Sequence, residues 1–225
     1  MRRGLNEQNL LSPFGLQGMR SIRIALLVAA LLTLAASTRS PAATSPDDTS
    51  QEDFLTGQFL IASPDMGDPR FYHAVILVVH HDKTGALGII VNRPVETRSL
   101  RQLLDDLGQP SKGAAGTIKV FAGGPVQPNL GFVLHSTDYK RAETLAIDRK
   151  VAVTSSPAVL QDIAQGHGPR KFIFAFGYAG WGPGQLESEL DQRAWFTAPD
   201  DPKLLFDDDR ATLWQDAIGR RSRAL

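Results

Sequence analysis

Two apolar segments separated by a short polar link constrain the fold of this chain most strongly. Residues 74–79 read AVILVV and residues 86–91 read ALGIIV, without the alternating polar positions of a strand that has one face in water. Residues 82–85 (DKTG) lie between them and place a turn former first and glycine last. The pattern predicts a β-hairpin at the centre of a sheet that is covered on both faces.

The rest of the pattern mixes strands and helices. A helix is expected to begin at Ser99, because Ser99 and Gln102 have the spacing of a capping box and leucines follow at helical intervals. A second helix is expected after Ser156, with Ser156 as its N-cap and Pro157 at its first position. Further helices are expected at residues 185–193 and 209–218, and further strands at residues 54–62, 118–122, 130–135, 151–154, 170–176 and 194–198. We therefore predict a mixed α+β fold that is neither a regular βαβ array nor an all-β sandwich.

The N-terminal residues differ from the rest of the chain. Residues 24–36 form an uncharged apolar run of thirteen residues, which Arg20 and Arg23 precede and small residues follow. This is the pattern of a secretory signal peptide, and the run is shorter than the roughly 20 residues of a membrane span. We expect a cleaved signal peptide over residues 1–43, with Met19 as an alternative start, and hence a periplasmic or secreted protein.

The predicted organisation continues with a flexible linker over residues 44–53, a single domain over residues 54–219 and a tail over residues 220–225. Removing residues 1–37 takes four basic residues and one acidic residue from 24 of each, and leaves 20 basic and 23 acidic residues. A protein that grips nucleic acid carries a basic face, so no nucleic-acid partner is expected. The absence of cysteine excludes disulfides and thiolate chemistry.

Neither the histidines nor the acids have the spacing of a standard metal site. His80 and His81 are neighbours at the end of a predicted strand, so their side chains point to opposite faces. The chain contains no H-E-x-x-H pattern. The acids at residues 207–209 could hold a divalent cation, but we favour a solvated turn in which Asp208 or Asp209 caps the last helix. We therefore expect no metal and no cofactor.

Three segments of the chain resemble one family of bacterial proteins. They are GQFLIASPDMGDPRFYHAVILVVHHDKTGALGIIVNRPVE (57–96), FAGGPVQPNLGFVLHS (121–136) and FGYAGWGPGQLESELDQRAWFTAPDDPKLLFD (176–207). With these segments in this order, the chain is similar to the AlgH/YqgE family. The resemblance implies a bifurcated, mostly antiparallel sheet that closes into a pseudo-barrel flanked by helices. It implies no agreed activity; part of the family name comes from a proposed role in regulating alginate synthesis. Family members usually look cytosolic, and the predicted signal peptide departs from that pattern.

The glycine-rich segment at residues 177–190 (GYAGWGPGQLESEL) is the first candidate ligand site, because it lies between a predicted strand and a predicted helix as phosphate-binding loops do. Its candidate binding residues are Gly180, Trp181 and Gly182. The glycines miss the G-x-G-x-x-G spacing, and Glu187 and Glu189 at the start of the helix repel an anion. We favour a tight corner of the fold in which Trp181 fills the core.

A second candidate site follows the predicted central hairpin. Its candidate binding residues are Asn92, Arg93, Gly123 and Gly124. Arg93 could bind a small anionic ligand beside the two glycines. We favour instead an ion pair between Arg93 and an acid such as Asp65 or Asp68, which would stabilise the loop.

These observations favour an exported binding or accessory module that acts without catalysis on an unknown protein partner. The membrane is expected to be involved only through an uncleaved signal segment. One alternative is an intracellular transcriptional or regulatory protein, as the family name implies. Another alternative is a hydrolase in which His135 or His80 acts with a serine that the fold brings close, since such pairs are recognised by geometry rather than by sequence order.

Overall fold

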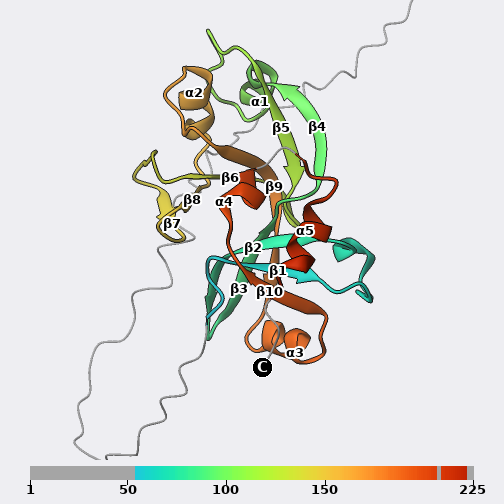
Figure 1. Ribbon diagram of the computed structural model, residues 1–225. Coiled ribbons are helices and arrows are strands. Elements are labelled where there is room, and N and C mark those ends of the chain that lie inside the picture. Colours follow the sequence, from blue (N-terminus) through green and yellow to red (C-terminus); the bar gives the residue numbers. More distant parts are fainter. Residues whose placement is uncertain (1–53, 207–208, 222–225) are drawn as a thin grey trace, which may run out of the picture. The chain divides into compact units, whose positions relative to one another are not determined.

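The computed structural model describes residues 54–206 and 209–221 (Figure 1). The predicted signal peptide and linker lie outside these residues, as do residues 207 and 208 before the last helix.

The predicted central hairpin is confirmed. Its strands are β2 (Val75–Asp82) and β3 (Gly85–Ile90), which pair in antiparallel fashion. Residues 75–79 of β2 are at most 5% exposed, as expected for a strand that is covered on both faces. The hairpin is therefore part of the core rather than of the surface.

Two strands extend the sheet beyond β2. The strand expected from residue 54 begins later, as β1 (Gln58–Ala62), because Gly57 adopts a positive φ of 83° immediately before it. β1 pairs with β2 on one side and with β10 (Trp195–Pro199) on the other, both antiparallel. Together with β3, these strands form one wing of the sheet, in the order β10-β1-β2-β3.

The remaining strands form a second wing, and β9 joins the two. They are β4 (Pro94–Ser99), β5 (Thr117–Ala122), β6 (Val126–Ser136), β7 (Thr144–Ala146), β8 (Val151–Thr154) and β9 (Phe172–Trp181). The first half of β9 lies between β5, which is parallel to it, and β6, which is antiparallel, and its last residues pair with β3. The other pairings of the described strands are antiparallel, and β4 pairs with β5. β4 and β7 are mostly exposed and were not expected from the sequence.

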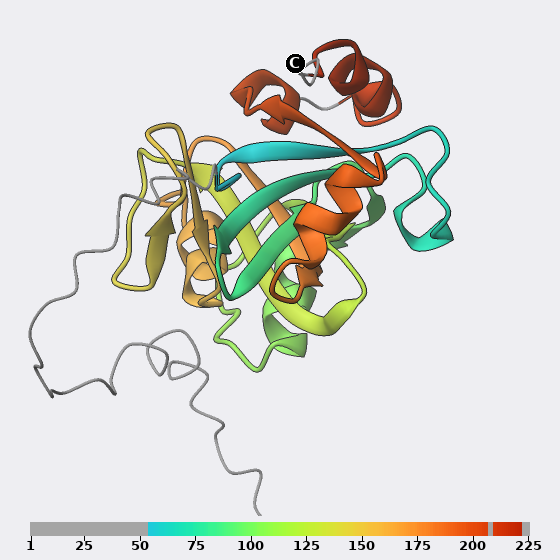
Figure 2. The ribbon, with the colours of Figure 1, turned by 90° about the horizontal axis from the view of Figure 1, so that it is seen from below.

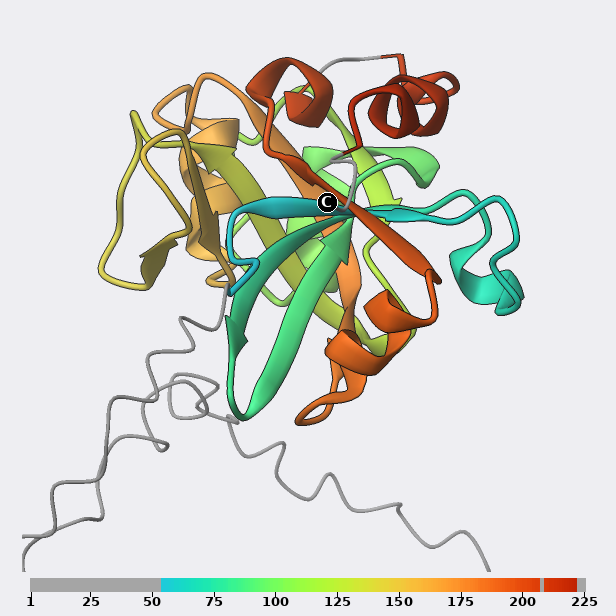
Figure 3. The same ribbon diagram turned by 60° about the horizontal axis from the view of Figure 1, so that its bottom comes forward.

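The sheet branches at β9 and curls, as Figures 2 and 3 show, so that its path runs β10-β1-β2-β3-β9-β6-β8-β7 with β5 and β4 on the branch. The mixed α+β fold with a bifurcated, mostly antiparallel sheet is thus confirmed, and the curled sheet forms a half-barrel. The register places Trp181, the last residue of β9, opposite Ala86 at the start of β3. This end of β9 is where the candidate site lies.

Short helices cover the sheet. They are the 3-10 turn η2 (Pro69–Phe71), α1 (Leu100–Asp106), α2 (Ala158–Ala164), α3 (Gln185–Asp191), α4 (Pro202–Phe206) and α5 (Leu213–Gly219). α1 and α2 pack over β5, β6 and β9, whereas α4 and α5 cover β1 and its neighbours (Figure 1). α3 follows β9 directly and contributes Leu186 to the core around Trp181. None of the helices in residues 54–206 and 209–221 has the length and apolar character that crossing a membrane requires.

The helix starts differ from the predictions in detail. Ser99 directly precedes α1, but its side chain makes no capping hydrogen bond, so the predicted capping box is not formed. The N-cap of α2 is Pro157 rather than Ser156, and α2 therefore starts one residue later than expected. α5 also begins late, and Asp209 accepts a hydrogen bond from the backbone N–H of Ala211 instead of capping the helix. Of the side chains that the sequence assigned to caps, Asp209 thus stabilises a local turn instead.

Candidate functional site

Only residues 182–184 of the glycine-rich segment form a turn, between the end of a strand and the start of a helix. β9 continues through Gly177 to Trp181, and Gly180 pairs with Leu87 across the sheet. The turn to α3 is confined to residues 182–184, where Gly184 has a φ of 71° and the N–H of Gly182 donates to Gln185 Oε1 at 3.1 Å. The favoured strand-to-helix corner is therefore present, but it is shorter than the loop expected from the sequence and comprises only residues 182–184.

Gly123 and Gly124 serve the close approach of two chain segments. A Cβ atom on Gly123 would overlap the carbonyl oxygen of Gly177, and a Cβ atom on Gly124 would overlap the backbone of Tyr178. The N–H of Gly123 donates to the carbonyl of Phe176 at 2.7 Å, which fixes this contact. The close packing of the two segments thus explains why both positions are glycine, without a role in ligand binding.

Asn92 and Arg93 hold the segment that leads into β2. The Asn92 side chain accepts from the N–H of Val75 at 2.9 Å and donates to the carbonyl of His73 at 2.8 Å. The Arg93 guanidinium donates to the backbone carbonyls of Arg70 and Tyr72, and burial lowers its pKa. The favoured loop-stabilising role fits, but the partners of Arg93 are carbonyls and not the predicted carboxylate, because Asp68 is paired with Arg70.

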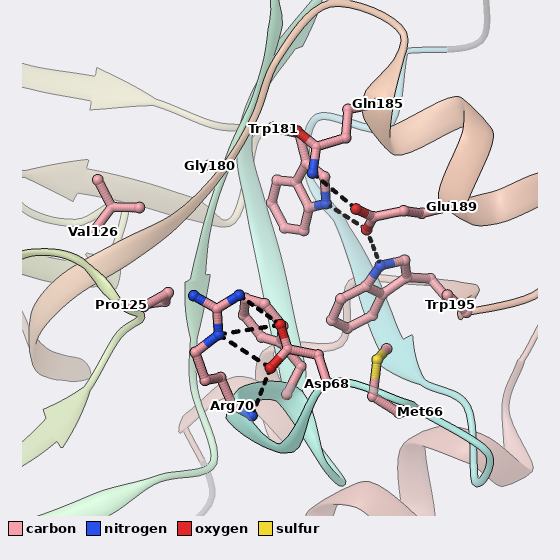
Figure 4. Close-up of a pocket in the computed structure, with 12 residues that line it drawn as sticks. Met66, Asp68, Arg70, Pro125, Val126, Gly180, Trp181, Gln185, Glu189 and Trp195 are labelled. Carbon is pink, nitrogen blue, oxygen red and sulfur yellow. Dashed lines mark hydrogen bonds and ion pairs between the residues drawn. The ribbon is translucent and has the colours of Figure 1, made fainter.

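A cavity of about 300 Å³ lies at the end of β9, between the η2 segment, the start of β6 and α3 (Figure 4). The apolar lining residues are Met66, Phe71, Pro125, Val126, Trp181 and Trp195, with Gly180 and Ala194. The polar lining residues are Asp68, Arg70, Gln185 and Glu189. Among the predicted ligand-binding residues, the cavity therefore brings together Gly180 and Trp181. The others lie outside its lining: Asn92, Arg93, Gly123, Gly124 and Gly182.

Glu189 organises one wall of the cavity. Its Oε2 accepts hydrogen bonds from the indole Nε1 of Trp181 at 2.8 Å and of Trp195 at 2.7 Å. Its Oε1 accepts from the side-chain amide of Gln185 at 2.9 Å. Figure 4 shows the carboxylate between the two indole rings. Three neutral donors thus fix the position of this carboxylate.

The aromatic rings of the cavity pack edge to face. Trp181 and Trp195 have ring centroids 6.0 Å apart at 79°, and Phe71 meets Trp195 at 5.5 Å and 69°. Both tryptophans are almost fully buried, with 7% and 3% exposure, because their rings also belong to the core. The rings therefore form a rigid floor that cannot easily rearrange.

An ion pair stands at the opposite side of the cavity. The Arg70 guanidinium donates to both carboxylate oxygens of Asp68, with Nη2 at 2.6 Å from Oδ2, and it lies 5.8 Å from the centroid of Phe71. The hydrogen bonds from Arg70 lower the pKa of Asp68, and the same contact raises the pKa of Arg70. Both groups therefore stay charged at neutral pH.

Sequence reasoning missed most of this cavity. It treated Glu189 only as an acid that repels anions, and it gave no role to Met66, Arg70, Phe71 or Trp195. One local signal was present, because Gln185 and Glu189 are four residues apart and hence neighbours on one face of α3. The contacts from Trp195 and from the η2 segment depend on strand pairing and had no local signal.

The histidines do not assemble a hydrolase site in the described part of the chain. His135 is fully buried, and its ring nitrogens contact the carbonyl of Ser136 and the hydroxyl of Thr154, each at 2.9 Å. His80 pairs with Asp82 at 3.0 Å. Neither ring meets a serine hydroxyl, so the geometry that the hydrolase alternative requires is not formed. No three His, Asp or Glu side chains gather as a metal site in residues 54–206 and 209–221.

The fold and the cavity define the class of this protein: a mixed α+β domain whose branched half-barrel sheet ends in an aromatic-lined cavity. The chain belongs to the AlgH-like family, whose family model matches residues 59–223. This result confirms the family resemblance.

Relatives and solved structures support the assignment. A UPF0301 protein of Jannaschia sp. is 44% identical over 166 residues, which cover 73% of this chain and 86% of that protein. A UPF0301 protein of Rhodospirillum rubrum is 43% identical over 167 residues, 74% of this chain and 87% of that protein. The solution structure of the AlgH protein from Pseudomonas aeruginosa has a TM-score of 0.64 and 38% identity, covering 79% of this chain and 92% of that one. A Corynebacterium diphtheriae protein with 18% identity and a TM-score of 0.61 shares the fold, over 75% of this chain and 87% of that one.

Proposed function

We propose that this chain is an exported binding or accessory module, and that it binds its ligand or a protein partner's side chain in the cavity at the end of β9. The observation that carries the proposal is the Glu189 carboxylate, which two indole groups and an amide hold at the wall of a cavity with both apolar and polar lining residues. Ligand sites commonly combine an apolar lining with a few fixed polar groups of this kind. A volume of about 300 Å³ is at the small end of such sites.

The lining favours binding over catalysis. The cavity residues that the structure describes include no Ser, Thr, His or Lys side chain that could act as a nucleophile or base. A carboxyl group that serves as a general acid needs a raised pKa, whereas the pKa of Asp68 is lowered. The same ion pair removes Asp68 from proton exchange near neutral pH.

Nuclear magnetic resonance of the tryptophan side chains tests the proposed site. The chain has three tryptophans, and two of them line the cavity, while the third, Trp214, donates its indole N–H to the carbonyl of Ala62. A fragment library containing cations, anions and neutral compounds should shift the indole N–H signals of Trp181 and Trp195 and leave that of Trp214 in place. A library in which no class of compound shifts the two cavity signals would reject the site.

Export is the second part of the proposal, supported by the basic start, the apolar run and the small residues of the first 43 positions. Mass spectrometry of the protein recovered from the periplasm or medium should find a mature N-terminus within residues 36–44. An intact Met1 or Met19 on a protein that stays in the cytosol would instead favour the intracellular regulator. A pull-down with the exported form then identifies the partner.

A further inference from the structure

We infer that the cavity at the end of β9 selects a small organic ammonium ion, an inference that rests on the cavity being the ligand site proposed above. The ligand class follows from the charges, the aromatic rings and the size of the cavity. The lining holds two carboxylates, Asp68 and Glu189, against one guanidinium, that of Arg70, which leaves a net charge of −1. The cavity therefore favours a cation over an anion.

Glu189 is the source of the uncompensated charge. Its three hydrogen-bond partners, two indoles and an amide, are all neutral. No basic side chain of residues 54–206 and 209–221 forms an ion pair with it. A carboxylate that is fixed in position but not neutralised attracts a positively charged group and requires little reorganisation to bind it.

The aromatic floor suits an ammonium group with apolar substituents. Trp181, Trp195 and Phe71 all line the cavity, and Met66 adds a further apolar wall. Trp181 and Trp195 are only 7% and 3% exposed, so they act as apolar walls, whereas the less buried Phe71 ring can attract a cation through its face. The protein itself illustrates this chemistry, because the Arg70 guanidinium lies over Phe71 while it pairs with Asp68. A ligand cation would pair with Glu189 and pack its apolar substituents against the aromatic lining that the cavity exposes.

Arg70 does not make the cavity an anion site. Its guanidinium already donates to both oxygens of Asp68, so an incoming carboxylate or phosphate would have to displace Asp68. The displaced Asp68 and the fixed Glu189 would then both repel the anion. The dimensions agree with this assignment, since about 300 Å³ accommodates a single side-chain-sized ion.

The decisive comparison uses three probes of similar size that differ in charge. Choline, its neutral isostere 3,3-dimethylbutan-1-ol and the anion butyrate are titrated into the chain as recovered from expressing cells, and the indole signals of Trp181 and Trp195 are followed. Choline is expected to bind at least about tenfold more tightly than the isostere, as an added charge-assisted contact implies. Equal affinity for choline and the isostere, or tighter binding of butyrate, overturns the ammonium assignment while it leaves the cavity as a ligand site. If none of the three shifts the signals while other fragments do, the ammonium assignment also fails.

The inference predicts that two substitutions at the cavity change the affinity for choline in opposite directions. Glu189→Gln keeps an acceptor for the indoles and removes the charge, and it should weaken choline binding on the order of tenfold. Arg70→Gln releases Asp68 and makes the lining more negative, and it should strengthen choline binding by a few-fold, whereas it would abolish binding of an anion. An unchanged affinity in Glu189→Gln, or a loss of choline binding in Arg70→Gln, contradicts the inference.

Glu187→Gln is the matched control, because Glu187 is on the same helix but contacts His81 at 2.6 Å and does not line the cavity. It should leave choline affinity unchanged. The indole signal of Trp214, bonded to Ala62, reports whether each variant is folded. If Glu189→Gln loses that signal, Asp68→Asn supplies the same loss of charge from the opposite wall, and it should also weaken choline binding.

The natural ammonium group can belong to a free amine or to a lysine side chain on a protein partner. A peptide with one central lysine and the same peptide acetylated at that lysine separate these sources from choline. Binding of the lysine peptide at an affinity similar to that of choline, lost on acetylation, identifies a partner's lysine. Binding of choline alone identifies a free amine.

Discussion

Two polar side chains lie at opposite ends of β9 and differ in what surrounds them. At the N-terminal end, His135 is paired across the sheet with Phe172, is fully buried, and has a partner on each ring nitrogen. At the C-terminal end, Glu189 contacts Trp181 and faces a cavity. The comparison teaches that a polar group in this fold is a candidate for ligand binding when it faces a cavity and its charge is not neutralised by its neighbours. A polar group that is buried with all its partners satisfied, such as His135, has a structural role instead.

The largest expected effect concerns the tryptophan at the C-terminal end. Trp181→Ala removes a side chain that is 7% exposed, together with its hydrogen bond to Glu189. The free energy of unfolding should fall by about 3–5 kcal/mol, the usual cost of truncating a buried aromatic residue. Urea denaturation followed by circular dichroism measures this change. A loss below about 1 kcal/mol would show that the ring is not part of the core.

The next effect tests whether the glycines beside this end are architectural. A Cβ atom on Gly124 would overlap the backbone of Tyr178, which cannot rotate away, so Gly124→Ala should lower the free energy of unfolding by about 3 kcal/mol. Gly182→Ala is the matched control, since the nearest atom to its Cβ would be Gln185 Oε1 at 3.9 Å. The control should change stability by less than about 0.5 kcal/mol. Equal stability losses in the two variants would remove the structural explanation for Gly124.

A smaller effect isolates the hydrogen bonds of Glu189. Glu189→Ala leaves the indole N–H groups of Trp181 and Trp195 without their acceptor, and we expect a loss of about 2 kcal/mol in the free energy of unfolding. Glu189→Gln keeps an acceptor oxygen in place and should cost less than about 1 kcal/mol. The same urea titration compares the two. If the glutamine variant is as unstable as the alanine variant, the charge rather than the hydrogen bonds supports the fold.

The sequence predicted the strands around β9 better than it predicted the side-chain contacts at the two ends of β9. The hairpin and the buried strand before the glycine segment could be recognised because continuous β-branched runs require cover on both faces, as β2 shows. The end of β9 could not, because its pairing of Gly180 with Leu87 depends on a strand almost a hundred residues away. Glycine in a strand and glycine in a loop have the same local pattern. The extension of β9 therefore appeared only in the structure.

The candidate site was out of reach for a related reason. Trp181 and Trp195 share one carboxylate oxygen only because β10 returns beside α3 after a turn, and Arg70 reaches the cavity from a segment before β2. The sequence predicted that Arg93 stabilises a loop, but it predicted a carboxylate as the partner. The actual partners are backbone carbonyls, which every residue has and which therefore give no sequence signal. Among the hydrogen bonds that Glu189 accepts, only the one from Gln185 joins residues that are near neighbours along the chain, and it is the only one of them that the sequence could have indicated.

The smallest expected effect concerns the pH dependence of the N-terminal end of β9. Burial lowers the pKa of His135 below its ordinary value of about 6.5, although the hydrogen bond with the Ser136 carbonyl and the negative charge of Asp138 act to raise it. Below that value the unfolded chain takes up a proton that the folded chain resists, so the free energy of unfolding falls as pH is lowered from about 6.5 to the folded pKa, and this contribution is flat at higher pH. Other groups also titrate in this range, so the test is the difference between the wild type and His135→Gln, measured by urea denaturation between pH 5 and pH 8. The wild type should lose more stability than the variant below about pH 6.5. Parallel pH profiles would mean that His135 carries no pH-dependent free energy.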